Sequence, residues 1–198
     1  MFEEKRARYE RTLVLQGNAA YAAGLALLMA HDARAAEWLR RAAARWRDSW
    51  GSDVPRDVWG RPIGALKASL LAGDDLAVRE IACWTLELGT ATADSPIGRY
   101  AGVLALLSLD RAPEARNVAA TLRGDDFPRD VVDALEAIAA GDADSYALAV
   151  ASVVRSFETR DAFLEDVRVA DTALVLDLLA RRAGIERDLP VSDVLPAT

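Results

Sequence analysis

His31 and Cys83 have the widest catalytic repertoire of any side chains in this sequence, and each residue type occurs once. Asp32 directly follows His31, and a carboxylate beside an imidazole can orient it as a general base. A Cys–His or Ser–His nucleophile system would have to use this one imidazole, and no serine lies in a Gly-x-Ser-x-Gly context. We therefore interpret His31-Asp32 as a turn between helices and Cys83, beside Trp84, as a buried and inert thiol.

The sequence also lacks the residue patterns of metal and phosphate sites. One histidine and one cysteine cannot supply the three or four ligands of a usual zinc site. Asp142-Ala143-Asp144 and Gly124-Asp125-Asp126 begin like calcium loops, but they lack the alternating oxygen ligands and the closing Glu. No Gly-rich loop runs into Lys-Ser or Lys-Thr. The sequence predicts no catalytic residues and neither a metal nor a cofactor, and hence a protein that is not an enzyme.

The tryptophans are the residues with the most potential for recognition. Trp38, Trp46 and Trp50 are spaced so that they share one broad face of a predicted helix. Trp59 follows after a loop, and Trp84 comes from the next helix pair. One interpretation is that these rings fill the core between the first two helix pairs.

The other interpretation is that rings and arginines flanking the loop form a contact surface. Trp and Arg are the residue types that contribute most to interface energetics. The candidate partner-contact patch consists of Arg47, Trp50, Arg56, Trp59 and Arg61. The sequence leaves both interpretations open.

Composition and charge limit the class of protein. The chain of 198 residues is 52% hydrophobic and 28% charged, as expected for one folded globular domain. Its net charge of -7 disfavours nucleic acid as a partner, because phosphate binding requires a basic face. The segment Met1–Arg6 lacks the basic-then-apolar order of a secretory signal, and we expect no membrane-spanning helix. We predict a cytoplasmic protein without a membrane partner, and leave a homo-oligomer open.

The apolar residues recur three and four positions apart almost throughout, which is the helical period. Gly and Pro interrupt this pattern, and Asp94-Ser95-Pro96 combines a capping residue with a proline that the first helical turn tolerates. Gly73, Gly141 and Gly184 stand where helices should end. The predicted helices cover residues 3–30, 33–50, 59–72, 75–89, 96–109, 112–123, 128–140, 143–158 and 161–183.

Tight turns between paired helices recur irregularly along this pattern. They fall near His31-Asp32, Gly73-Asp74, Asp110-Arg111 and Gly141-Asp142, roughly every 36 residues, a period typical of helix-pair repeats. Because one pair cannot bury its apolar face alone, neighbouring pairs must stack. We predict a single all-α helical-repeat domain over residues 1–198, a short and compact α-solenoid of about nine helices. Residues 184–198 form an extended C-terminal tail.

The residues of the first pair and the turns resemble the tetratricopeptide repeat. Gly17-Asn18-Ala19-Ala20-Tyr21-Ala22-Ala23-Gly24 looks like the first half of that motif, and Ala36-Glu37-Trp38-Leu39 with Ala42-Ala43 looks like the second. Gly73-Asp74-Asp75-Leu76-Ala77 and the corresponding residues 141–146 look like its inter-helix turn. The resemblance is degenerate and covers most of the chain. It implies antiparallel helix pairs stacked in the tetratricopeptide-like manner.

A second resemblance lies in the last third of the chain. It comprises the turn Gly141-Asp142, the helix that ends in Arg155-Ser156-Phe157, residues 178–185 and Leu195-Pro196. These residues are similar to the bacterial polymorphic-toxin immunity protein family forty-nine. The similarity implies a helical protein that neutralises a cognate toxin by binding it.

Three functions follow as hypotheses. The first is a non-enzymatic interaction domain that binds a protein or peptide, with an immunity-type inhibitor of a basic toxin as its specific form. The second is a small-molecule or lipid-binding helical domain with an apolar pocket lined by Trp46, Trp84 and Tyr100. The third is an enzyme that uses carboxylates alone, for which the sequence offers no facing acidic pair.

Overall fold

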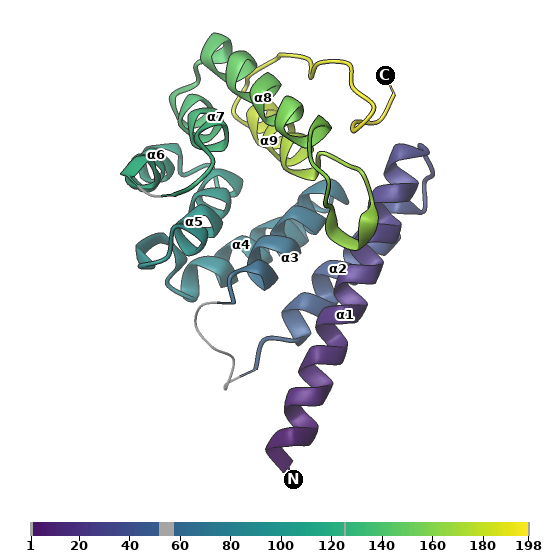
Figure 1. Cartoon of the computed structure of the whole chain (residues 1–198). Coiled ribbons are helices and arrows are strands. Elements are labelled where there is room, and N and C mark those ends of the chain that lie inside the picture. Colours follow the sequence, from purple (N-terminus) through teal and green to yellow (C-terminus); the bar gives the residue numbers. More distant parts are fainter. Residues whose placement is uncertain (1, 52–57, 125, 198) are drawn as a thin grey trace.

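The computed structural model describes residues 2–51, 58–124 and 126–197 (Figure 1). Within these ranges the chain is all-helical and contains no strand, which confirms the predicted fold class. Three short 3₁₀ turns, η1 (Thr90–Thr92), η2 (Leu122–Gly124) and η3 (Leu164–Asp166), accompany the longer helices. The α-helices are α1 (Phe2–Met29), α2 (Ala35–Asp48), α3 (Gly60–Leu71), α4 (Asp75–Glu87), α5 (Pro96–Ser108), α6 (Ala112–Thr121), α7 (Arg129–Ala140), α8 (Ala143–Glu158) and α9 (Asp171–Arg182).

Local chemistry explains why the helices end where the sequence predicts. Gly141 follows the last residue of α7 with φ +69°, a left-handed conformation that glycine adopts without steric cost. Asp142 then caps α8, because its carboxylate accepts the backbone N–H groups of Asp144 and Ser145. Asp74 caps α4 in the same way through the N–H of Ala77. Each turn therefore stops one helix and starts its antiparallel neighbour.

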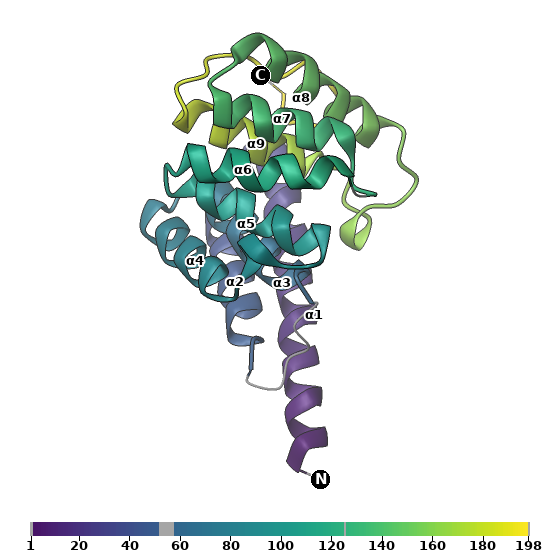
Figure 2. The same cartoon turned by 90° about the vertical axis from the view of Figure 1, so that its left-hand side faces the viewer.

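Consecutive helices pack on one another from α1 to α9, and the last helix folds back into the stack. Helix α9 contacts α3, α5 and α7 in addition to α8, so the array is closed on itself (Figures 1 and 2). A strictly linear solenoid would give each pair contacts with its neighbours alone. One shared core results, and five of its fully buried leucines come from five helices: Leu39, Leu66, Leu104, Leu135 and Leu176.

The segment before α9 corrects the prediction of a helix over 161–183. Helix α9 begins only at Asp171, and the preceding residues form an irregular loop that contains η3. Glu165 and Asp166 have φ of +50° and +58°, which an α-helix cannot accommodate. Val169 is buried, and the N–H of Ala170 donates to the carbonyl of Val194 in the C-terminal tail at 2.8 Å. The loop therefore makes its contacts with the tail and, through η3, with α1.

Helix α1 is longer than its partners, and its first turns project from the body of the molecule (Figure 2). By length and composition alone, Glu4–Met29 is the one described helix long and apolar enough to cross a membrane, with a mean hydropathy of 1.4 in its most apolar stretch. This departs from expectation, because Thr12 to Ala30 carry no charged residue. Helices buried in the cores of globular proteins can have the same length and composition, and Leu13, Tyr21 and Leu25 of α1 are buried here.

Candidate functional site

The tryptophans predicted as a core or a contact patch lie mostly in the core. Trp59 is 8% exposed and Trp84 is 9% exposed. The ring of Trp50, which is half-buried, stacks on Trp59 at 6.4 Å between centroids and meets Trp84 edge-on at 5.7 Å. The low exposure of Trp59 favours the core interpretation for this ring, which is packed between Trp50 and Gly98 of α5.

The arginines of the predicted patch lie apart from one another. Arg47 stacks on Trp84, with its guanidinium 4.8 Å from the ring centroid, over a hollow on the outer side of α4. Arg61 donates to the carbonyl of Ser49 at 2.6 Å and lines a different hollow, against α1. Arg56 lies outside the described residues. Among the predicted patch residues that the structure describes, only Arg61 borders the site described next.

That site is a buried polar cluster that sequence reasoning missed. Lys67 of α3, 9% exposed, donates from Nζ to Oδ2 of Asp171 at 3.0 Å and to the hydroxyl of Thr172 at 2.8 Å. Tyr21 of α1 donates its hydroxyl to the same Oδ2 at 2.8 Å. Tyr100 of α5 is also buried and lies close enough to interact with the charge of Lys67. Four helices thus meet around one ion pair.

The environment holds each member of this cluster in one protonation state near neutral pH. Burial raises the pKa of Asp171, but Lys67 and the hydrogen bonds from Lys67 and Tyr21 outweigh it, so that the pKa of Asp171 falls below its usual value. Burial lowers the pKa of Lys67, but attraction to Asp171 reverses the direction and leaves this pKa raised. Burial and the charge of Asp171 raise the pKa of Tyr21 well above its usual value. The cluster therefore fixes charges and hydrogen bonds and does not release protons readily.

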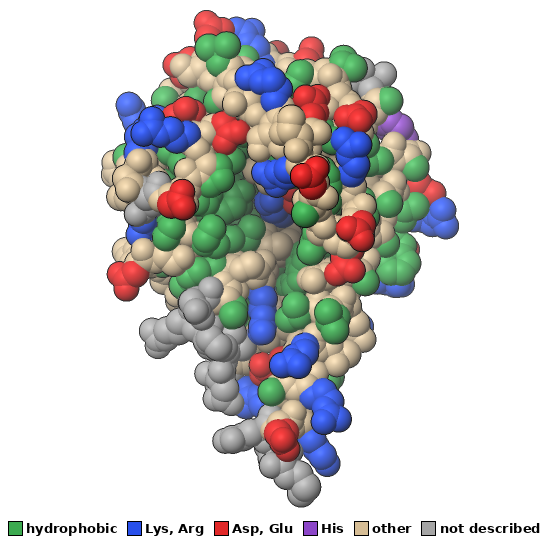
Figure 3. All heavy atoms as spheres, viewed as in Figure 1, with side chains coloured by type: hydrophobic (Ala, Val, Ile, Leu, Met, Phe, Trp, Pro, Cys, Tyr) green, Lys and Arg blue, Asp and Glu red, His purple; other side chains and the backbone are tan. Residues whose placement is uncertain are grey.

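Two hollows, which we call together the Lys67 groove, open onto this cluster. The smaller, of about 300 Å³, lies between α1 and the loop before α9, and Leu25, Phe163 and Val167 form its apolar wall. The larger, of about 480 Å³, lies between α1 and α3, and Val14, Trp46 and Ile63 form its apolar wall. Four residues border both hollows: Tyr21, Lys67, Leu164 and Asp171. Figure 3 shows an open hollow on this face between hydrophobic side chains, with Lys or Arg side chains above and below it.

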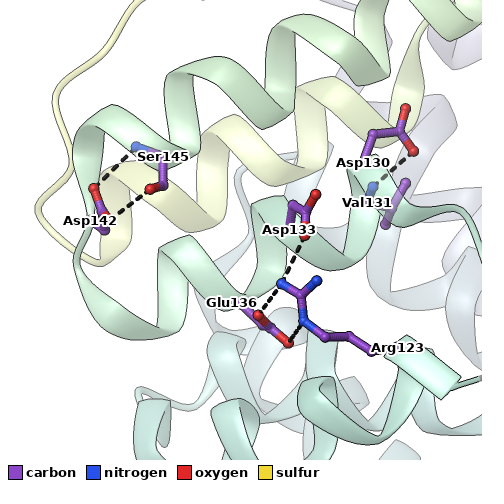
Figure 4. A network of polar contacts seen from close by, with 7 residues as sticks. All are labelled: Arg123, Asp130, Val131, Asp133, Glu136, Asp142 and Ser145. Carbon is purple, nitrogen blue, oxygen red and sulfur yellow. Dashed lines mark hydrogen bonds and ion pairs between the residues drawn. The ribbon is translucent and has the colours of Figure 1, made fainter.

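A second polar network lies on the outer face of α6, α7 and α8 and has a structural explanation. Arg123 of η2 pairs with Asp133 at 2.8 Å and with Glu136, both on α7 (Figure 4). Asp142 is occupied in capping α8. A shallow hollow of about 590 Å³ passes over these residues. The network joins η2 to α7. Because two carboxylates neutralise the guanidinium of Arg123, this arginine has no positive charge left to attract a ligand.

The structure also locates the other residues that the sequence analysis considered, His31-Asp32 and Cys83. His31 has φ +53°, and Asp32 accepts the backbone N–H of Arg34 at 2.9 Å, so this pair forms a turn as predicted. Cys83 is exposed, and the prediction of a buried thiol is wrong because Cys83 occupies the outer side of α4 between buried Ala82 and Trp84. Within the described ranges, no group of three His, Cys, Asp or Glu side chains could hold a metal ion.

No protein-family model, no curated protein and no solved structure matches this chain.

Proposed function

We propose that this chain is a non-enzymatic binding domain that receives a segment of a protein partner in the Lys67 groove. The observation that carries the proposal is the junction of the two hollows at Lys67 and Asp171. A recess with apolar walls and a few convergent polar groups is typical of binding sites. The two hollows share lining residues and are open to solvent, which suits an extended segment better than an enclosed small molecule.

The protonation behaviour of the cluster supports binding over catalysis. A general acid or base works best when its pKa lies near the operating pH. The pKa values of the three groups are instead shifted away from neutrality: the pKa of Asp171 is lowered, and those of Lys67 and Tyr21 are raised. A raised pKa also keeps the Lys67 amine protonated and thus unable to attack a carbonyl group.

The specific form of the proposal is an immunity-type inhibitor in the cytoplasm that binds a basic toxin. The net charge of -7 supports it, since opposite charges on two partners accelerate association and suppress wrong partners. We also propose that the paired helices form a tetratricopeptide-like solenoid. The Gly-Asp turns before α4 and α8 support this architecture, and the fold-back of α9 onto α3 is its main departure.

The proposal can be tested with two exposed leucines. Leu164, 45% exposed, borders both halves of the groove, whereas Leu148, 76% exposed, lies on the outer side of α8. A photocrosslinking amino acid at Leu164 should give an adduct of one discrete mass in the source cells, and the same group at Leu148 should not. The partner identified in this way should bind the purified Leu148→Asp variant normally and the Leu164→Asp variant at least tenfold more weakly. Equal binding to both variants would exclude the groove as the binding surface.

One observation favours a small-molecule ligand as a second candidate. Trp46, which we expected in an apolar pocket, does line the larger hollow, although Trp84 and Tyr100 do not. A bound ligand would appear in native mass spectra of protein purified from the source cells as a fixed added mass at one-to-one stoichiometry. The protein-partner proposal predicts the unliganded mass instead.

A further inference from the structure

The Lys67 groove has a charge opposite in sign to that of the whole chain. Three cationic side chains border it: Lys67 at the junction, Arg61 in the larger hollow and Arg160 in the smaller. Asp171 is the one carboxylate among the described residues that line the two hollows. The chain as a whole has 31 acidic residues against 24 basic ones. The groove is therefore a local positive site on an acidic protein.

The two arginines are not neutralised by carboxylates of their own. Arg160 is exposed, and its guanidinium lies 3.7 Å from the centroid of the Phe157 ring. Arg61 donates to a backbone carbonyl, and Glu10 acts on it only through its charge. Neither arginine forms an ion pair with a residue in the described part of the chain. Both remain able to receive an anionic group.

Lys67 has hydrogen-bonding capacity left as well. An ammonium group has three N–H donors, and two of them are used by Asp171 and Thr172. The raised pKa of Lys67 keeps the group charged. Its third N–H could donate to a carboxylate that entered the groove, and Arg61 and Arg160 would supply the positive charge that Asp171 does not already match.

We infer that the groove is specific for an acidic segment of a protein partner, in which an Asp or Glu side chain lies between Lys67 and the two arginines and is flanked by apolar residues. This inference rests on the proposed function and names the chemistry of the segment: a partner that is basic overall would be attracted by the acidic surface and would place one acidic segment in the groove. The apolar walls, with Ile63 on one side of Lys67 and Phe163 on the other, would cover the flanking residues. A polyanion such as nucleic acid fits less well, because the acidic remainder of the surface would repel it.

The test uses random peptides displayed on phage and selected on the wild-type protein. The enriched peptides should contain Asp or Glu next to apolar residues, and the dissociation constant of a fluorescent copy is measured by anisotropy. The Arg61→Gln and Arg160→Gln variants should each weaken binding by about fivefold, and the double variant by tenfold or more. Arg155→Gln is the matched control, since Arg155 is exposed on α8 and borders neither hollow; it should leave binding unchanged.

The outcomes separate this inference from the proposed function. One outcome would overturn the inference and leave the proposed function standing. In it, the peptides bind Leu164→Asp more weakly than the wild type, but they show no preference for Asp or Glu and bind the arginine variants as well as the wild type. Failure to enrich any peptide, or binding that is indifferent to Leu164→Asp, would overturn both. A fluorescent oligothymidine that binds as tightly as the peptides, and is released by the double arginine variant, would also overturn the acidic-segment inference.

Discussion

The ammonium nitrogen of Lys67 lies 3.0 Å from Oδ2 of Asp171, in an ion pair between residues 104 positions apart in the sequence. The pair joins α3 to the first residue of α9, and the hydroxyl of Tyr21 on α1 donates to the same oxygen. A carboxylate at the start of a helix also interacts favourably with the helix dipole. One partly buried carboxylate thus connects the beginning, the middle and the end of the stack.

Removal of the cation alone should destabilise the protein strongly. Lys67→Met leaves the partly buried Asp171 without its charge partner, for which we expect a loss of about 3 kcal/mol in the free energy of unfolding. The triple variant Tyr21→Phe, Lys67→Met, Asp171→Leu removes the ion pair and the hydroxyl bonded to it and should regain most of that loss, because the desolvation cost of the two charges also disappears. Urea denaturation followed by circular dichroism measures both. A triple variant as unstable as Lys67→Met would contradict this account.

The same ion pair predicts a dependence of stability on pH. The pKa of Asp171 is lower in the folded protein than in the unfolded chain, so its contribution is present above pH about 4 and is lost as the pH falls through the folded value. The pKa of Lys67 is raised, so its contribution is present below pH about 10 and is lost as the pH rises through the folded value.

Urea denaturation at pH 7 and at successively lower pH should therefore show a fall in the free energy of unfolding that is shallower in Asp171→Asn. Part of the fall will persist in the variant. The hydrogen bonds from Arg34 lower the pKa of Asp32 to about 2, and the hydrogen bonds from Ser145 also lower the pKa of Asp142. Identical slopes in the wild type and Asp171→Asn would show that the ion pair contributes nothing to acid stability.

The fold follows from the sequence where the signal is local. Gly141 and Asp142 are adjacent, and together they stop α7 and cap α8 without help from the rest of the chain. The segment before α9 was mispredicted because its apolar residues also fit a helical period. What decides its structure is distant, since the N–H of Ala170 bonds to Val194 and Val169 is buried in the core. No pattern in a single sequence indicates that Ala170 and Val194 pair.

The candidate site was missed for a related reason. Lys67 and Asp171 meet only because α9 folds back onto α3, and no spacing rule connects residues so far apart. One sequence signal was available, since Lys67 stands alone among small and apolar residues in the stretch Ile63–Leu71. A lysine in such a stretch has to find a buried partner or be displaced. The spacing of the tryptophans predicted a shared helix face, but not that Trp59 would pack against Gly98 of α5 and Trp50.

Trp46 provides a test of close packing in the first three helices. A Cβ atom on Gly17 of α1 would lie 2.8 Å from Trp46 Cδ1, and one on Gly64 of α3 would lie 2.8 Å from Cζ3. The indole is held between two helices and cannot retreat, and its Nε1 donates to Asn18 at 3.2 Å. Gly17→Ala and Gly64→Ala should each destabilise the protein by about 1–2 kcal/mol, although alanine favours the helix.

Gly60→Ala is the matched control for both glycine variants. A Cβ atom on Gly60, at the start of α3, meets nothing within 4 Å. The change should therefore stabilise the protein by roughly 0.5 kcal/mol through the lower entropy of the unfolded chain. Thermal unfolding of the three variants measures the difference. Destabilisation by Gly60→Ala as large as that by Gly17→Ala would indicate a general intolerance of these helices and not a clash with Trp46.

Trp59→Ala separates the two interpretations of the tryptophan cluster. A contact surface predicts a variant of normal stability with a lost partner, whereas a core residue predicts a cavity. Because Trp59 packs on Gly98 of α5 and stacks on Trp50, we expect a loss of about 3–4 kcal/mol in the free energy of unfolding. Trp38→Ala, at a half-buried ring beside Arg41, should cost about 1 kcal/mol and controls for the loss of an indole as such. Equal and small losses in the two variants would place Trp59 at the surface in solution and restore it to the contact patch.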